Sequence, residues 1–241
     1  KEFVKNNPTK ILLTTYEGHS FERLFYYVAK KYNKNLITIG YQHISFTKLQ
    51  HSANIILKDS YNPDYRLTSG LNCFEQIKNN NCIKKILGSP KYENIIHDTD
   101  FKKICFPINI LVIPEADEIE SYELFNYSYI NAQKLKNVNF IWRPHPMLNF
   151  NKILKKIPNY KKNTNILISN NDIKFDFDLA HFAIYRGSST IIQGICSGIA
   201  PLFLENDNEI SINPLYKINN LIYNLSNENT LISFINEMKY Q

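Results

Sequence analysis

Residues 181–204 read HFAIYRGSSTIIQGICSGIAPLFL, and this segment indicates the class of fold. It opens with a short apolar run at 181–185, continues at 188–197 with a segment typical of a helix, and returns to an apolar run at 199–204. Gly198 separates the helix from the second run, at a place where glycine commonly ends a helix. A strand, a helix and a second strand in so short a span predict a βαβ unit, and therefore a parallel α/β sheet.

The same alternation extends outward along the chain. Further short apolar runs predict strands at 10–15, 35–43, 64–70, 83–88, 108–114, 138–146 and 165–169. Helical periodicity predicts helices at 19–32, 71–79, 117–135 and 227–239, the first with Ser20 as its N-cap. The pattern predicts an α/β protein with two Rossmann-like parallel sheets.

A break in this pattern divides the chain. Residues 89–107 have weak periodicity and contain prolines, so we predict one domain over 1–105 and a second over 106–241. The first domain has fewer strand–helix units than the second and begins almost directly with a strand. We therefore expect the first domain to be incomplete and truncated at its start.

Composition limits the classes of protein that the chain can belong to. Its 241 residues carry a net charge of +6, contain no long apolar run and lack an apolar signal core. The four cysteines are Cys73, Cys82, Cys105 and Cys196, whose scatter argues against a disulfide framework or a common zinc site. We expect a reduced, cytoplasmic protein that binds no nucleic acid, since it has no basic tail or aromatic–basic RNA motif. A peripheral contact with the cytoplasmic face of a membrane stays open, because a net positive charge also suits anionic headgroups.

Two polar segments follow predicted strands of the second domain, where open parallel sheets bind ligands. The first is Trp142–Pro146, in which Arg143 and His145 suit a phosphate and Pro146 stiffens the loop. The second contains Arg186, Gly187, Ser188, Ser189 and Thr190, and it opens a helix whose free N–H groups would favour an anion. The plainer alternatives are a rigid strand end with a surface histidine, and a helix capped by Ser188 or Ser189.

The first domain offers a carboxylate at the end of its first predicted strand. Glu17 precedes Gly18 and His19, and it is either a general base or a partner of the helix dipole. The residues expected on the acceptor side, or supporting it, are His19, Glu22, Arg23, Gln42 and His43. Glu22 and Arg23 alternatively form an exposed helical face or an internal ion pair. In the second domain Glu115, Asp117, Glu118 and Glu120 are interpreted as an acidic first helical turn, and we expect no metal.

The order of these motifs resembles GT-B-fold glycosyltransferases that synthesise bacterial surface polysaccharides such as capsule or lipopolysaccharide. The resemblance is strongest to sialyl- and Kdo-type transferases, which use CMP-activated sugars. Tyr16-Glu17-Gly18 is similar to their acidic motif, His145-Pro146 to their His-Pro motif, and Ser188-Ser189-Thr190 to their hydroxyl motif. The resemblance implies an inverting, metal-independent transfer without a cofactor, with Glu17 and His145 catalytic and the 143–146 and 186–190 segments holding the donor.

Three alternatives stay open beside this interpretation. CDP-glycerol-type transferases share a similar His-Pro and Ser-Ser arrangement. A nucleotide-sugar 2-epimerase would also use strand-end carboxylates and a His/Arg phosphate site. A non-catalytic nucleotide- or sugar-binding module is the third. The expected partners are a nucleotide sugar, most simply CMP-linked, and a glycan acceptor.

Overall fold

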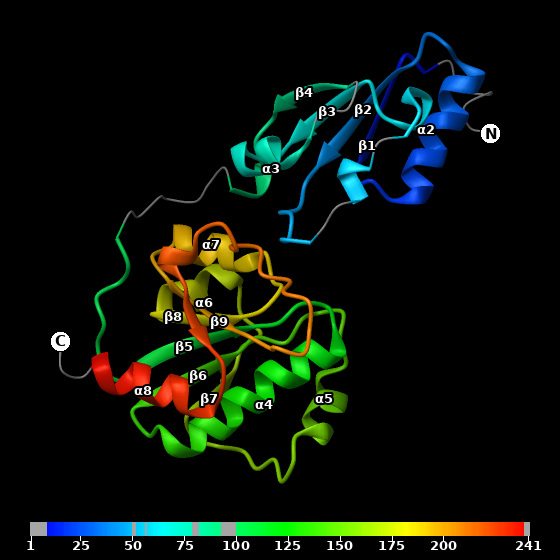
Figure 1. Cartoon of the computed structure of the whole chain (residues 1–241). Helices are drawn as coiled ribbons and strands as arrows, with labels where there is room; N and C mark the ends of the chain where they lie inside the picture. Colours follow the sequence, from blue (N-terminus) through cyan, green and yellow to red (C-terminus); the bar gives the residue numbers. More distant parts are fainter. Residues whose placement is uncertain (1–8, 50–51, 56, 79–81, 93–99, 239–241) are drawn as a thin grey trace. The chain divides into compact units, whose positions relative to one another are not determined.

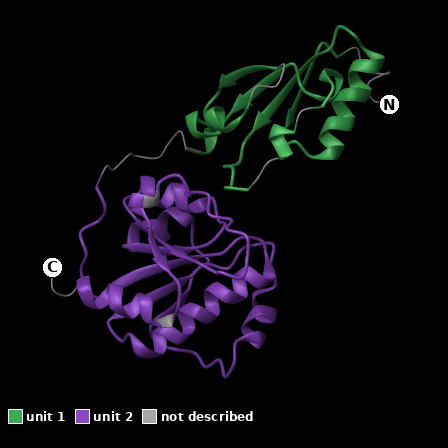
Figure 2. Ribbon diagram, viewed as in Figure 1, with its two compact units in different colours: residues 1–93 green, residues 94–241 purple. Residues whose placement is uncertain are grey.

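The computed structural model describes residues 9–49, 52–55, 57–78, 82–92 and 100–238. It divides the chain into two compact units, residues 1–93 and 94–241 (Figure 2). Sequence reasoning placed the boundary later, at 105/106. Each unit has its own parallel sheet, so the prediction of two Rossmann-like α/β sheets is confirmed.

The second unit, called unit 2, contains a six-stranded parallel sheet (Figure 1). Its strands are β5 (Ile108–Ile113), β6 (Val138–Trp142), β7 (Ile166–Ile168), β8 (Phe182–Tyr185), β9 (Ala200–Leu204) and β10 (Tyr223–Leu225). Their order is β10-β9-β8-β5-β6-β7, which reverses direction between β5 and β8. That reversal makes a doubly wound sheet, and ligands of such sheets bind outside the carboxyl ends at the point of reversal.

Helices cover both faces of this sheet: α4 (Glu118–Lys134), α5 (Phe150–Lys156), α6 (Ile173–Leu179), α7 (Thr190–Cys196) and α8 (Glu228–Met238). The buried apolar residues form one cluster that includes Trp142 and parts of α4 and α8, and another that includes Tyr185 and parts of α6 and α7. Because both faces are covered, the central strands β5, β6 and β8 are apolar except at Asn109 and Asn139, which is why the sequence revealed them.

The first unit, called unit 1, has four parallel strands in the order β1-β2-β3-β4. They are β1 (Ile11–Thr15), β2 (Ile37–Gln42), β3 (Tyr65–Thr68) and β4 (Ile83–Ile86), accompanied by α2 (Ser20–Tyr32) and α3 (Leu71–Gln76). Among the described residues, the first sheet has four strands and the second has six, as the prediction of fewer units in the first required. Successive strands always step in one direction, and right-handed crossovers then fall on one face of the sheet.

In the part of unit 1 that the structure describes, the other face of the sheet is exposed. Its aligned side chains include Ile11, Leu13, Ile37 and Ile83, which are between 43% and 62% exposed although they are apolar. The covered face carries Thr38, Gln42 and Arg66, all fully buried. Parallel sheets normally bury both faces, so unit 1 has the one-sided form that its strand order dictates.

Several details differ from the predicted elements. Helix α2 begins at Ser20 with His19 as its N-cap, so the prediction that Ser20 caps it was wrong. Sequence reasoning missed α5, α6 and β10, although Asn149 caps α5 and Asp172 caps α6 through side-chain bonds. Each missed helix has only seven residues, too few to show clear periodicity.

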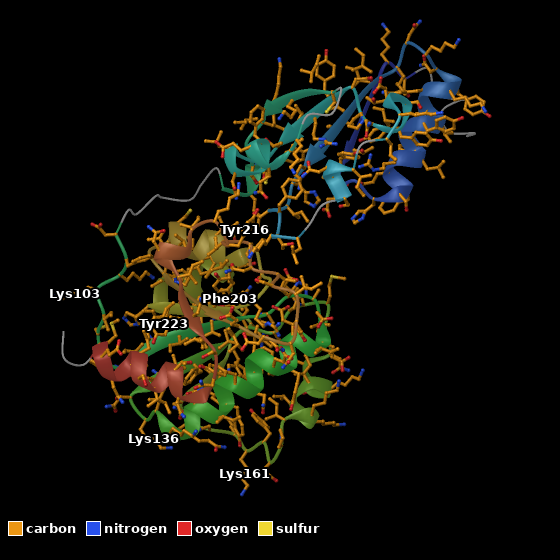
Figure 3. The ribbon with its side chains drawn as sticks, in the orientation of Figure 1. Lys103, Lys136, Lys161, Phe203, Tyr216 and Tyr223 are labelled. Carbon is orange, nitrogen blue, oxygen red and sulfur yellow. The ribbon has the colours of Figure 1, made fainter. Side chains whose placement is uncertain are left out.

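Some of the positively charged side chains of unit 2 are solvated lysines. Lys103, Lys136 and Lys161 are exposed, and Figure 3 shows them at its periphery, whereas Phe203 is buried. Among the described residues, no helix is both long and apolar enough to cross a membrane.

Candidate functional site

A pocket of about 200 Å³ lies at the point where the unit 2 sheet reverses direction. Its lining comes from the ends of three strands: Ile113 and Pro114 after β5, residues 143–146 after β6, and Thr190 and Gln193 after β8, with Ile173 from α6. The structure therefore brings together Arg143, His145, Pro146 and Thr190, which sequence reasoning had assigned to one donor site. Because α/β sheets bind ligands at this position, the pocket is the candidate functional site of unit 2.

Arg143 is held in place by one end of its guanidinium group. Nη1 donates to Oδ2 of the buried Asp176 at 2.6 Å and to the carbonyl of Asn171 at 2.7 Å. Ser169 donates to the other oxygen of Asp176, so this carboxylate is itself fixed. The side chain of Arg143 stays 27% exposed, which leaves the rest of the guanidinium group to face a ligand. A preorganised arginine of this kind suits a phosphate.

His145 presents one ring nitrogen to solvent. Its Nδ1 accepts a hydrogen bond from the backbone N–H of Met147 at 3.3 Å. In the neutral ring the proton is then on Nε2, which can donate to an anionic oxygen. The flanking Pro144 and Pro146 restrict the backbone and so fix the direction of the ring.

Replacing His145 with alanine is expected to weaken nucleotide binding while leaving the fold intact, because the side chain is partly exposed and outside the core. Loss of one hydrogen bond to a charged group costs about 1.5–3 kcal/mol, which is roughly one to two decades in affinity. Isothermal titration with nucleotide measures the effect, and Met147→Ala on the same loop is the matched control. Unchanged affinity in His145→Ala would leave His145 as a surface residue.

Two predicted phosphate-binding residues have partners within the protein. Arg186 is 3% exposed and forms ion pairs with Glu123 and Glu209. Gly187 donates its N–H to Glu120, and a Cβ on Gly187 would lie 2.9 Å from the Glu115 carboxyl carbon. Arg186 and Gly187 therefore organise the loop from within, because neighbouring acids occupy the groups that were expected to face a phosphate.

The three hydroxyl residues after Gly187 differ in whether they line the pocket. Ser188 is buried, and Ser189 is the N-cap of α7 without a side-chain cap bond. Neither lines the pocket, whereas Thr190 does. The acidic turn at the start of α4 is confirmed for Glu118 and Glu120 with Asp117 as the N-cap, whereas Glu115 lies before the helix.

A larger hollow, about 470 Å³, adjoins the other side of the 143–146 loop. Apolar side chains, Leu148, Phe150 and Leu154, share its lining with Asn151, Asn170 and Asn171. Apolar surface with a few amide groups is typical of sites that bind a small-molecule ring. Sequence reasoning missed this hollow; the only signal was the polar Asn170-Asn171 pair directly after the strand at 165–169.

In unit 1 the structure brings Glu17 together with two of the predicted histidines. The Glu17 carboxylate lies 3.3 Å from Nε2 of His19 and 3.8 Å from Nδ1 of His43. The Glu17 side chain is 16% exposed, while the two histidines are almost half exposed. The three side chains follow β1 and β2, whose carboxyl ends are adjacent in the sheet. A carboxylate with two neighbouring imidazoles can accept a proton and pass it on.

Glu22 and Arg23 bind the backbone of the segment that carries Glu17 and His19. Oε2 of Glu22 accepts from the backbone N–H groups of Glu17, Gly18 and His19 at 2.8–3.0 Å, and it thereby satisfies the start of α2. Arg23 is 4% exposed and donates to four groups of the chain. They form neither an exposed helical face nor a pair with one another. Their contacts fit the supporting role among the predicted alternatives.

Gln42 is also internal. It is fully buried, and its amide nitrogen donates to the carbonyl of Ile44 at 3.2 Å. Its bond to the backbone directly after His43 fits a supporting role as well. Among the described residues, no group of three or more His, Cys, Asp or Glu side chains is placed to hold a metal ion.

Neither a family model nor a curated protein matches the chain. Solved structures do. A protein from Listeria monocytogenes that is provisionally assigned as a UDP-N-acetylglucosamine 2-epimerase aligns with a TM-score of 0.58 at 12% identity, over 100% of this chain and 68% of that one. S. aureus MnaA, solved with UDP, gives a TM-score of 0.60 at 12% identity, over 100% of this chain and 68% of its own. The glycotransferase of kitacinnamycin gives a TM-score of 0.59 at 11% identity, over 93% of this chain and 66% of its own.

The chain thus spans about two thirds of the length of these structures. Identities near one in ten show shared architecture without fixing activity. The two parallel sheets, their helices and these alignments agree with one another: the chain has a GT-B-like fold, built from two Rossmann-like domains.

Proposed function

We propose that the chain is a glycosyltransferase that binds its nucleotide-sugar donor through unit 2. The observation that carries the proposal is the convergence of Arg143, His145 and Thr190 on one pocket at the reversal point of the sheet. Together they offer a guanidinium group, an imidazole N–H and a hydroxyl, which are donors suited to a phosphate.

The donor phosphate would lie against Arg143 and His145, and the hollow beside Asn170 and Asn171 offers room for the base. As the sugar–phosphate bond breaks, negative charge develops on the departing phosphate. Arg143 and His145 would stabilise that charge, because both are fixed before the reaction begins. No cofactor is needed for this step, since the donor is itself the substrate.

In unit 1, Glu17 would act as the base. It would remove the proton from an acceptor hydroxyl as the new glycosidic bond forms, with inversion at the sugar carbon. His19 and His43 contact the Glu17 carboxylate and could receive the proton from it. We further propose a CMP-linked donor and a surface-glycan acceptor, both from the resemblance of the motifs, and a cytoplasmic location for the reaction.

A thermal-shift panel of CMP, CDP, UDP, GDP and ADP tests the proposal. A ligand at a hundredfold excess over its Kd stabilises the folded protein by about 2.7 kcal/mol. We expect CMP or CDP to raise the melting temperature more than the other nucleotides. Equal shifts from all five would remove the cytidine assignment, and no shift from any would contradict a nucleotide site.

A nucleotide-sugar 2-epimerase is the second candidate, favoured by the alignment with the Listeria monocytogenes and S. aureus structures. The two activities differ in their products. Incubation with a labelled donor and a glycan acceptor gives a labelled glycan if the chain is a transferase. An epimerase instead returns the label in an epimeric nucleotide sugar without any acceptor.

A further inference from the structure

Glu120 joins the two loops that border the unit 2 pocket. It lies in the first turn of α4, and its Oε1 accepts from the N–H of Gly187 at 3.1 Å while its Oε2 accepts from the N–H of Glu115 at 3.2 Å. Glu115 follows β5 and Gly187 follows β8, so one carboxylate connects both sides of the point where the sheet reverses. Glu120 is only 5% exposed. Three residues after Gly187 comes Thr190, which lines the pocket.

The charges around Glu120 are mostly negative. Glu115 lies beside it on the β5–α4 loop, and Arg186 is the positively charged group that stabilises the ionised form of Glu120. The guanidinium group of Arg186 is shared with Glu123 from α4 and Glu209 from the segment after β9, and Asp117 caps α4. One arginine therefore offsets several carboxylates.

Burial in this setting raises the pKa of Glu120 from the ordinary 4.5 to about 7, and the neighbouring Glu115 carboxylate acts in the same direction. The N–H groups of Gly187 and Glu115 act in the opposite direction, because they stabilise the ionised form. The carboxyl group therefore changes its charge close to neutral pH.

We propose that Glu120 positions the Gly187–Thr190 loop and takes up a proton when a nucleotide phosphate binds in the adjacent pocket. This inference rests on the proposed function. A bound phosphate brings negative charge to the loop that Glu120 holds, and that charge favours the neutral carboxyl group. Linkage is reciprocal, so protonated Glu120 must bind phosphate more tightly than ionised Glu120.

The sign of the pH dependence follows. Below pH 7 Glu120 is neutral and does not oppose the phosphate. As the pH rises through 7 it ionises, and the nucleotide affinity falls until the pKa of the bound state is also passed. If binding raises the pKa of Glu120 by about one unit, the affinity falls by about tenfold across this window, and about half a proton is taken up at pH 7.5.

The experiment is isothermal titration of the full chain with CMP, in two buffers of different ionisation enthalpy, from pH 6 to pH 9. Glu120→Gln is nearly isosteric with the protonated side chain, so it should match the wild type at pH 6. At pH 9 it should bind up to about tenfold more tightly, with proton uptake lower by about half a proton at pH 7.5. Glu118→Gln is the matched control on the same helix, since Glu118 pairs with Lys152 and Lys156 on an exposed face. It should keep the wild-type profile.

Thermal unfolding without nucleotide supplies a second readout. Since the pKa of Glu120 is raised in the folded state, the wild type should lose stability relative to Glu120→Gln as the pH rises from about 4.5 to 7. Weaker binding of Glu120→Gln at every pH, with an unchanged slope and proton count, would reduce Glu120 to a structural residue and overturn the inference. If none of CMP, CDP, UDP, GDP and ADP binds, the proposed function fails and the coupling fails with it.

Discussion

Replacing Glu17 with glutamine is expected to lower the rate of sugar transfer by about 10²–10⁴-fold, which is the usual contribution of a general base. Glutamine keeps the size of the side chain but cannot accept the proton of an acceptor hydroxyl. The affinity for nucleotide should stay unchanged, because Arg143, His145 and Thr190 all belong to unit 2. Transfer is measured with a labelled donor, and donor affinity by titration calorimetry on the same preparation.

Glu75→Gln is the matched control for this variant. Glu75 is an exposed carboxylate on α3 of the same unit, so its loss removes the same charge without touching the Glu17 cluster. The competing interpretation treats Glu17 as a partner of the α2 dipole, worth about 0.3–1 kcal/mol of stability. Normal transfer with a slightly lower melting temperature would support that interpretation and move the base to His19 or His43.

The strands of unit 2 could be predicted because strands that are buried on both faces consist mostly of apolar residues. INILVI at 108–113 and FAIY at 182–185 admit no polar residue except Asn109. The pocket followed from the same logic. Arg143 comes directly after β6, and Thr190 opens the helix that follows β8. Both strands are neighbours of β5, so topology brings the two residues to the same edge of the sheet.

The direction of a side chain at a strand end could not be predicted. Arg186 and Arg143 occupy equivalent places after β8 and β6, yet Arg186 turns to Glu123 and Glu209 while Arg143 stays partly open. The partners that decide this are distant in the sequence. The role of Gly187 could not be predicted either. A glycine can make room for a ligand or, as here, for the Glu115 side chain, and a single sequence does not distinguish the two.

The sequence did not predict that one face of the unit 1 sheet is exposed, and the reason is different. Leu13 and Ile37 lie on the open face, but they are as apolar as the residues of a covered strand. Sequence periodicity reports which side chains are apolar, and the strand order decides which face receives the crossovers. A single sequence does not contain that order.

The geometry of the Glu17 cluster depends on Arg23, whose guanidinium group spans the segment that passes over Gly18. Nε donates to the carbonyl of Gly18 at 3.0 Å, Nη1 to Oδ1 of Asn62 at 2.8 Å, and Nη2 to the carbonyls of Ser52 and Ile55. Ser52 in turn donates its hydroxyl to the carbonyl of Glu17 at 2.8 Å. Gly18 has φ +86°, and a Cβ there would lie 2.5 Å from the Ser52 carbonyl oxygen. The backbone that carries Glu17 is therefore held by Arg23 through Gly18 and Ser52.

Arg23→Met keeps the length and packing of the side chain but leaves four acceptors without their donor, and the bonds to the Gly18 carbonyl and to Asn62 are buried. Each unmade buried hydrogen bond costs about 1–3 kcal/mol, so unit 1 should lose at least about 2 kcal/mol, or roughly thirtyfold in protection from hydrogen exchange. Lys31→Met removes a positive charge from the exposed face of the same helix and should change little. Exchange measured by mass spectrometry over β1 and α2 gives the effect, with β5 and β8 as internal references.

Arg23→Lys should recover only part of the loss, because an ammonium group cannot reproduce the planar fork of the guanidinium group. Transfer should fall in Arg23→Met together with the stability of unit 1, whereas Glu17→Gln should lower transfer alone. Full protection of β1 and α2 in Arg23→Met would show that this network does not hold the Glu17 backbone.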